Sequence, residues 1–193
     1  MNKKKDLLII IDMINGFVNF GALADKKINK VTPKIIDLIK KASINGTHII
    51  AFRDAHSIND EEFNTYPVHC LKGSEESKLI PELAVYKDSM WEIEKDTTNG
   101  FVTKDFLELV RKFDFNNVYV VGCCTDICVL NFVNSYLAFN KKYNKSTKIV
   151  VVENACATFD SPSHNAKEMH DKAILEMEQN GAIIARSKEN IKE

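Results

Sequence analysis

The chain has 193 residues, with 45% hydrophobic residues, 27% charged residues and a formal net charge of −1. This composition is typical of a globular domain, and so neutral a charge gives no reason to expect nucleic acid or an anionic membrane as a partner. The basic start at residues 3–5 resembles a signal sequence, but the apolar run behind it ends at Asp12 and is too short for a signal core or a membrane span. We therefore expect a single domain over residues 1–193, soluble and cytoplasmic, with its five cysteines reduced.

Short apolar runs alternate with helical patterns along the chain. The runs, which are typical of buried strands, cover residues 7–11, 47–52, 90–93, 118–121, 149–152 and 181–185. Helical periodicity separates them at residues 35–39, 106–110, 127–139 and 166–179. Strands that alternate with helices predict a parallel sheet with helices on both faces. We therefore predict an α/β fold, a three-layer α/β/α arrangement around a six-stranded, mostly parallel sheet.

The fourth apolar run leads into the most reactive stretch of the chain. The predicted strand at residues 118–121 is followed by Gly122, two adjacent cysteines and a helical pattern that contains Cys128. We expect Thr125 or Asp126 to cap this helix, which places Cys128 in its first turn. Unpaired N–H groups and the positive end of the helix dipole favour a thiolate there. Cys128 is therefore a candidate nucleophile, although a lone cysteine in a helix is also a common core residue.

A nucleophilic thiol needs partners, and charged residues follow two other predicted strands. Asp12 ends the first strand and Lys95 follows the third. The carboxyl ends of parallel strands collect at one edge of an open sheet, where ligands bind at the switch point of strand order. Burial would raise the pKa of Asp12 so that it can act as a base, and Lys95 would stabilise both negative charges. The N–H groups of Cys124 and Cys128 could form an oxyanion hole, while a turn-forming aspartate and a solvated lysine are the competing interpretations.

A second cluster lies in the polar segment after the second predicted strand. Asp54 and His56 alternate along an extended stretch and so point to the same side, and His69 lies in the same segment. Two histidines and a carboxylate with open positions suit one divalent metal ion, with zinc, iron or manganese as the candidates. Glu61 or Glu62 could bind the ion directly or through water. Histidines that face solvent are the competing interpretation, and a structural zinc site is disfavoured because the chain has no CxxC pair.

Aromatic residues supply candidates for a pocket that binds a flat ring, although each of them is also a candidate for the core. These candidates are Phe17, Phe20, Tyr66, Trp91 and Phe101.

Taken together, five segments resemble a known family. They are IIDMINGF at residues 10–17, RDAH at 53–56, YPVHCLKG at 66–73, Lys95, and GCCTDICV at 122–129. In this order, and over nearly the whole chain, they resemble the isochorismatase-like cysteine hydrolases and, within them, the nicotinamidases. Isochorismatases proper lack the nucleophilic cysteine, and several related amidases lack the metal ligands, whereas this chain has both.

The resemblance implies a six-stranded parallel sheet and a catalytic triad of Asp12, Lys95 and Cys128. It also implies a cis peptide bond between Cys123 and Cys124. Members of the family commonly assemble into dimers or tetramers, so we expect a homo-oligomer.

The resemblance further implies a bound metal ion and a ring-binding pocket. The residues that match the family's metal ligands are Asp54, His56, His69 and, as in some members, Glu62. The residues expected at the substrate are Phe17 and Tyr66, which match ring-packing positions, and Trp91. The ion would hold the pyridine nitrogen of nicotinamide and orient its carboxamide toward the cysteine.

We therefore expect an amidohydrolase that converts nicotinamide to nicotinate and ammonia through a thioester on Cys128, as in NAD salvage. Two alternatives stay open. A related amidase would act on another small amide, because Thr98 stands where many nicotinamidases carry an aromatic residue. A non-catalytic thiol or metal module in redox sensing would also make use of the clustered cysteines.

Overall fold

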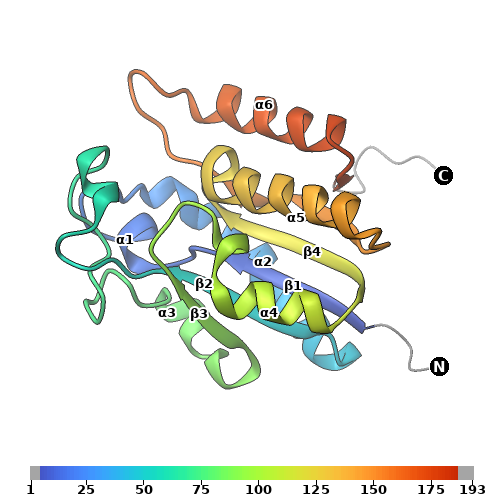
Figure 1. The fold of residues 1–193 in the computed structure, drawn as a ribbon. Helices are drawn as coiled ribbons and strands as arrows, with labels where there is room; N and C mark the ends of the chain where they lie inside the picture. Colours follow the sequence, from blue (N-terminus) through green and yellow to red (C-terminus); the bar gives the residue numbers. More distant parts are fainter. Residues whose placement is uncertain (1–4, 187–193) are drawn as a thin grey trace.

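The predicted sheet is present in the computed structural model, which describes residues 5–186 (Figure 1). Its strands are β1 (Lys5–Ile11), β2 (His48–Asp54), β3 (Trp91–Lys95), β4 (Phe115–Cys123), β5 (Lys148–Ala157) and β6 (Ile183–Ala185). They pair in the order β3-β2-β1-β4-β5-β6, and every pairing is parallel. The predicted α/β class is therefore confirmed. Residues 3 and 4 of the basic start lie outside the described range.

Helices cover both faces of the sheet, which gives the three predicted layers (Figure 1). One face carries α4 (Lys104–Lys112), α5 (Leu130–Tyr143) and α6 (Ala166–Gln179), and the other carries α1 (Asn15–Val18), α2 (Thr32–Asn45) and α3 (Pro81–Ala84). Side chains alternate along each strand, so that Leu7 and Ile9 join one core while Leu8 and Ile10 join the other. Within residues 5–186, every helix is too short or too polar to span a bilayer.

The limits of α2 follow from its sequence. Pro33 stands in the first turn, where its missing N–H costs nothing, and Gly46 ends the helix in the left-handed conformation with φ 65°. The helix therefore ends at Asn45, directly before Gly46.

The strand order reverses between β1 and β4, because the chain builds β1, β2 and β3 in one direction and then returns to the other side of β1. A crevice is expected at the carboxyl ends of the strands at such a switch point. Gly122 lies there with φ +118°, and a side chain at this position would clash with the backbone oxygen of Ile11. The glycine therefore lets the end of β4 lie directly against β1.

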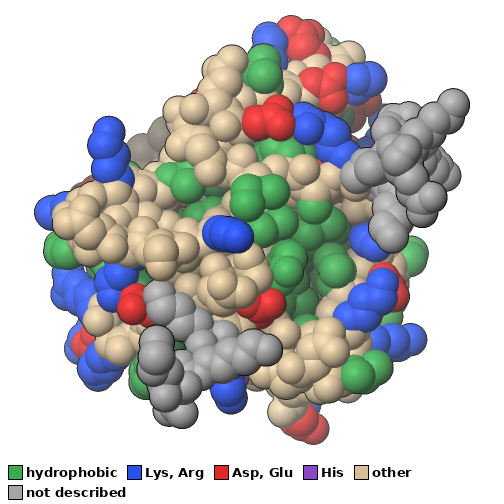
Figure 2. Space-filling view, turned by 90° about the vertical axis from the view of Figure 1, so that its right-hand side faces the viewer, with side chains coloured by type: hydrophobic (Ala, Val, Ile, Leu, Met, Phe, Trp, Pro, Cys, Tyr) green, Lys and Arg blue, Asp and Glu red, His purple; other side chains and the backbone are tan. Residues whose placement is uncertain are grey.

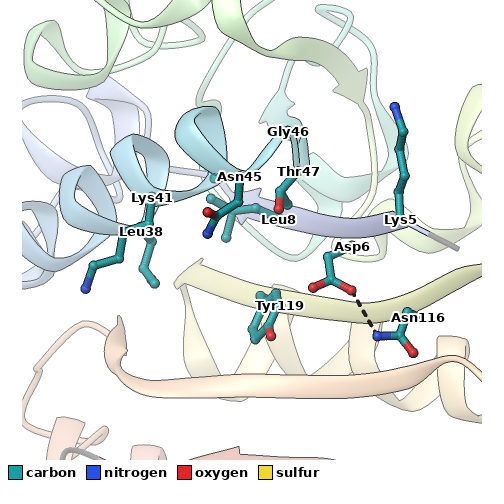
Figure 3. Close-up of a pocket in the computed structure, with 11 residues that line it drawn as sticks. Lys5, Asp6, Leu8, Leu38, Lys41, Asn45, Gly46, Thr47, Asn116 and Tyr119 are labelled. Carbon is teal, nitrogen blue, oxygen red and sulfur yellow. Dashed lines mark hydrogen bonds between the residues drawn. The ribbon is translucent and has the colours of Figure 1, made fainter. Parts of the chain in front are cut away.

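The opposite edge of the sheet, where the strands begin, is mainly hydrophobic at its centre. Figure 2 shows this side, with hydrophobic side chains gathered at its centre. A hollow of about 830 Å³ opens there between α2 and the starts of β1 and β4 (Figure 3). Leu8, Leu38 and Tyr119 line it together with Lys5 and Lys41. Neither cysteine nor histidine occurs among the described residues of its wall, so it offers no nucleophile or metal ligands of these types.

Candidate active site and metal centre

The structure brings Asp12, Lys95 and Cys128 together at the carboxyl edge of the sheet. Asp12 follows β1 with φ 53°, Lys95 ends β3, and Cys128 lies in the turn after β4. The Nζ atom of Lys95 lies 2.8 Å from Oδ2 of Asp12 and 4.0 Å from Sγ of Cys128. It also forms a second ion pair, with Asp54 at the end of β2. All four side chains are buried, so their charges act on one another with little screening by water.

The two carboxylates that share Lys95 differ in their acidity. Burial raises the pKa of Asp12 to about 7, and the charge of Asp54 adds to this effect while Lys95 opposes it. For Asp54, burial also acts to raise the pKa, but the charge of Lys95 and the adjacent imidazoles of His56 and His69 lower it well below its usual range. Asp12 is therefore the carboxylate suited to accept and release a proton near neutral pH.

Cys128 is a neutral thiol at rest, which differs from the expectation that a helix end favours the thiolate. Burial raises the pKa of Cys128 well above its usual value, and the nearby charge of Lys95 offsets only part of this effect. Taking the sulfur out of water costs the anion more than a helix end restores. The thiol therefore needs a base, and Asp12 is the neighbouring candidate.

The turn that carries Cys128 also differs from the predicted helix start. Residues 125–129 form η5 (Thr125–Val129), a π-helical turn, and neither Thr125 nor Asp126 caps it. Instead, Oγ1 of Thr125 lies 2.9 Å from Nδ1 of His170, and Oδ2 of Asp126 lies 2.7 Å from Nε2 of His164. The expectation of a cap was wrong because both side chains are bound by histidines from α6 and the loop before it.

The two adjacent cysteines occupy different environments. The peptide bond between Cys123 and Cys124 is cis, as the family resemblance implied. Cys123 is buried, and its thiol donates to the backbone oxygen of Asp12 over 3.1 Å. Cys124 is only partly buried and lines the cavity described below. A role of the Cys124 N–H in an oxyanion hole stays a prediction.

The four expected metal ligands, Asp54, His56, Glu62 and His69, converge beside this cluster. Each offers one ligand atom, and these atoms lie within 4.8 Å of one another. The Nε2 atoms of the two histidines lie 3.6 to 3.9 Å from carboxylate oxygens of Asp54 and Glu62. Two imidazoles and two carboxylates around one point suit a divalent cation.

The backbone brings His56 and His69 together although 13 positions separate them. The N–H of His56 donates to the oxygen of Cys70 over 3.0 Å, and the N–H of Lys72 donates to the oxygen of His56 over 2.9 Å. These bonds form a short parallel bridge, which lays the loop beside the extended chain after β2. Gly16 lets α1 pack against this loop, since a side chain there would clash with the sulfur of Cys70.

The outer nitrogens of both histidines lie beside oxygen atoms, and their inner nitrogens lie toward the cluster. Nδ1 of His69 lies 2.8 Å from the backbone oxygen of Pro67, and Nδ1 of His56 lies 3.1 Å from Oδ2 of Asp60. Such outer partners fix the tautomer of a metal-binding histidine. Nε2 of His56 is buried and has no hydrogen-bond partner among the described residues. The donor set therefore fits one divalent ion.

A cavity of about 310 Å³ joins the two clusters. Cys128 and Cys124 line it on one side, and Asp54, Glu62 and His69 line it on another. The rings of Phe17 and Tyr66 complete the wall, with centroids 5.8 and 6.3 Å from that of His69. The cavity is thus a small space, part aromatic and part polar, between a thiol and a cluster of candidate metal ligands.

Three of the aromatic candidates lie elsewhere. Trp91 does not line this cavity, because it begins β3 whereas Lys95 ends the same strand, and its side chain is 45% exposed. Phe101 is buried in the core against Phe106 and Tyr136. Phe20 is 49% exposed. The expectation that Trp91 binds substrate is therefore corrected by the position of the residue in its strand.

The sequence interpretation missed two residues of this region. Phe159 lines the cavity, and Asp60 holds His56. Phe159 lies just after the carboxyl end of β5, but the predicted run ended at residue 152, so the rule that found Asp12 and Lys95 did not reach it. For Asp60 the available signal was a carboxylate four residues after a candidate ligand.

Comparison with known proteins agrees with this arrangement. Residues 6–189 match the model of the isochorismatase domain. Nicotinamidase 1 of Arabidopsis thaliana is 34% identical over 179 residues, which cover 84% of this chain and 73% of that protein. The solved pyrazinamidase/nicotinamidase of Streptococcus mutans has a TM-score of 0.81 and 25% identity, covering 94% of this chain and 100% of that one. The N-carbamoylsarcosine amidase of Thermoplasma acidophilum has a TM-score of 0.76 and 26% identity, covering 98% and 99%. The chain therefore belongs to the isochorismatase family of hydrolases.

Proposed function

We propose that this hydrolase converts nicotinamide to nicotinate and ammonia, with Cys128 as its nucleophile. The observation that carries the proposal is that one cavity is lined both by the buried thiol of Cys128, which lies beside Lys95 and its partner Asp12, and by three members of the four-residue cluster of candidate metal ligands. The relative that is 34% identical is a nicotinamidase, which supports the same substrate.

The cavity walls suit a small aromatic amide. Phe17 and Tyr66 offer apolar surface for a planar ring, while the thiol of Cys128 faces the space where a carboxamide would lie. A divalent cation bound by Asp54, His56, Glu62 and His69 would supply a Lewis acid for a ring nitrogen or for water. The aromatic wall and the cation together would orient the ring of the substrate.

In the first half of the reaction, the carboxylate of Asp12 accepts the proton of the Cys128 thiol. Lys95 stays protonated, because the negative charges around it raise its pKa well above the usual value although burial opposes this. The thiolate attacks the carboxamide carbon, a C–S bond forms, and the carbonyl electron pair moves to oxygen. The N–H groups of Cys124 and Cys128 donate to this oxyanion, at roughly 3–4 kcal/mol per donor where such bonds have been measured.

The second half releases both products. Asp12 gives its proton to the amide nitrogen, the C–N bond breaks, and ammonia leaves a thioester on Cys128. A water molecule then loses a proton to Asp12 and attacks the thioester carbon. The C–S bond breaks, the sulfur recovers the proton that Asp12 holds, and the product leaves as nicotinic acid, which loses its proton to water and becomes nicotinate.

The decisive measurement is ammonia release from nicotinamide by wild type and by Cys128→Ala. We expect the variant to lose activity by at least about 10³-fold, since the nucleophile is gone. Cys156→Ala is the matched control, because Cys156 is also a buried free cysteine but lies in the core and does not line the cavity. Activity of Cys128→Ala within tenfold of wild type would rule out this nucleophile.

A second substrate class is favoured by Thr98, which gives the cavity wall a polar side chain. The Nδ2 group of Asn131 donates to its Oγ1 over 3.1 Å, which holds the hydroxyl in place. An N-carbamoyl compound, the substrate named for the Thermoplasma neighbour, would offer polar groups to such a wall. Values of kcat/KM for nicotinamide, pyrazinamide and N-carbamoylsarcosine separate the two. If kcat/KM is tenfold higher for N-carbamoylsarcosine than for nicotinamide, the carbamoyl compound becomes the assigned substrate.

A further inference from the structure

His164, in the loop between β5 and α6, makes three contacts that the proposed chemistry does not use. Its Nε2 atom lies 2.7 Å from Oδ2 of Asp126, and its Nδ1 atom lies 3.0 Å from the backbone oxygen of Phe159. Its ring also stacks on the ring of Phe159, with centroids 3.8 Å apart and planes 9° from parallel. The side chains of His164 and Asp126 are 15% and 6% exposed. The contacts are therefore largely shielded from water.

The hydrogen-bond acceptors around the His164 ring indicate that the imidazole is protonated. Both ring nitrogens of His164 face oxygen atoms, one of a carboxylate and one of a backbone carbonyl, and both of these accept hydrogen bonds. A neutral imidazole carries one N–H and can satisfy one of them, whereas an imidazolium satisfies both. Burial lowers the pKa of His164, but the hydrogen bond and charge of Asp126 outweigh it and raise the pKa above its ordinary value. Both the hydrogen-bond geometry and the electrostatics therefore favour a protonated His164.

This cation connects the turn that carries Cys128 to Phe159 in the wall of the cavity. Asp126 lies two positions before Cys128 in η5, and Phe159 lines the cavity from the loop after β5. The loop is itself closed by two backbone bonds of 2.9 and 3.1 Å between Ser161 and His164. The position of the Phe159 ring is therefore coupled to η5 through one side chain.

We propose that His164, as an imidazolium bound to Asp126, is a positioning residue that holds the ring of Phe159 as a wall of the substrate cavity. The inference rests on the proposed function, because a rigid aromatic wall matters most for a planar aromatic amide. His164 does not touch the reacting atoms, so its effect falls on substrate binding and not on the chemical step. The stacked cation also fixes the plane of the Phe159 ring.

The charged groups around His164 determine how its contacts with Asp126 and Phe159 depend on pH. Asp126 faces it from η5, and Asp160 acts on it from its own loop. Asp160 is already paired with Lys27 of η1 (Lys26–Val31) over 3.0 Å, so Asp126 is the principal partner. Loss of the imidazolium proton leaves one of the two oxygen atoms without a donor. KM is therefore expected to rise as the pH passes the pKa of His164.

The first test reads the protonation of His164 without any turnover. Long-range ¹H–¹⁵N spectra of the wild-type protein, labelled at histidine, are recorded from pH 5 to pH 9. We expect both nitrogens of His164 to keep their protons to a higher pH than those of a free histidine, because Asp126 raises its pKa. His170 is the internal control, because it contacts the same turn but burial lowers its pKa. Loss of the His164 proton at the same pH as in a free histidine, or at a lower pH, would overturn the inference, whether or not nicotinamide is the substrate.

The second test separates binding from chemistry. His164→Gln is expected to raise KM for nicotinamide about tenfold and to leave kcat within about threefold, whereas His164→Arg, which keeps a planar cation that stacks and donates, restores KM. In a Phe159→Leu background the His164→Gln change has little further effect, since both act through one wall. His48→Gln, at the exposed start of β2, is the matched control.

An unchanged KM in His164→Gln, or a loss confined to kcat, contradicts the positioning role. If the wild type does not hydrolyse nicotinamide, the proposed substrate is wrong. The KM values of wild type and His164→Gln are then compared with the amide that the wild type does hydrolyse, and this comparison decides whether His164 is a positioning residue.

Discussion

Three charges meet at Lys95, whose ammonium group lies between the carboxylates of Asp12 and Asp54. One positive and two negative charges leave an excess negative charge, which is costly in a buried site. Asp12 bears most of this cost, since its pKa is raised while that of Asp54 is lowered. The same imbalance that makes Asp12 a usable base therefore reduces the stability of the folded protein at neutral pH.

Replacement of Asp12 by asparagine separates these two effects. We expect Asp12→Asn to lose at least about 10²-fold in activity, because the thiol loses its base. The pKa of Asp12 rises from 3.8 to about 7 on folding, so the native state binds this proton more tightly than the unfolded state. Wild type therefore loses stability as pH rises from about 4 to about 7, by up to about 4 kcal/mol at about 1.4 kcal/mol per pH unit, and the variant lacks this loss.

The measurement is urea unfolding of both metal-free proteins, in the presence of a chelator, at pH 5 and at pH 8. The stability of Asp12→Asn relative to wild type should be greater at pH 8. A difference that is the same at both pH values would show that the Asp12 carboxyl is not perturbed in this way.

At the scale of elements, the contact of β4 with β1 depends on Gly122, whose φ of +118° and lack of a side chain allow the close approach. We expect Gly122→Ala to cost more than about 3 kcal/mol or to prevent folding, because the added carbon meets backbone atoms of Ile11 that cannot move aside.

Gly46→Ala is the matched control, since Gly46 also has a positive φ but has open space around it. It should cost about 1 kcal/mol, from backbone strain alone. Urea midpoints of the two purified variants give the comparison. Equal losses in both would mean that φ, and not the close approach, makes Gly122 necessary.

The elements themselves were largely predictable, and the exceptions have local causes. The predicted run at residues 149–152 is only part of β5, which continues to Ala157. Glu153 and Asn154 interrupt the apolar pattern there, and the pairing register with β4 shifts between Val120 and Gly122. Periodicity loses its phase at such an irregularity. Periodicity also did not predict the π-helical form of η5. The polar side chains of this turn contact His164 and His170, which lie far away along the chain, and a local pattern contains no record of such contacts.

At the scale of the whole molecule, the metal-binding cluster ties the loop after β2 to the edge of the sheet. An ion that binds the folded state alone stabilises it, by about 2.7 kcal/mol at 100 times its dissociation constant. Zinc added to the metal-free protein should therefore raise Tm by several degrees, with one ion bound per chain. His69→Ala should lose most of this increase.

His48→Ala is the control for that measurement, because His48 lies exposed at the start of β2, far along the strand from Asp54. Calorimetry with zinc, iron and manganese in turn gives both the stoichiometry and the preferred ion. If none of the three raises Tm, the cluster does not hold a metal.

Membership in a hydrolase family sets aside the non-catalytic redox module that the clustered cysteines had left open. The homo-oligomer expected from the family resemblance stays a prediction, and so does the assignment of each residue at the site. Among the aromatic residues considered for the pocket, the structure places Trp91, Phe20 and Phe101 elsewhere.

The sequence by itself determined the class of fold and the chemical types of the site, because both depend on local patterns. Apolar runs that alternate with helical periodicity define a parallel sheet, and the polar residues Asp12, Asp54 and Lys95 lie at or directly after the ends of their strands, at one edge. Only the tertiary structure decided the charge states, since the pKa values of Asp12 and Cys128 depend on burial and on neighbours from other strands. It also decided that Phe159 lines the cavity, because β5 continues beyond the predicted run to Ala157, and it placed Trp91 at the start of β3, away from the cavity.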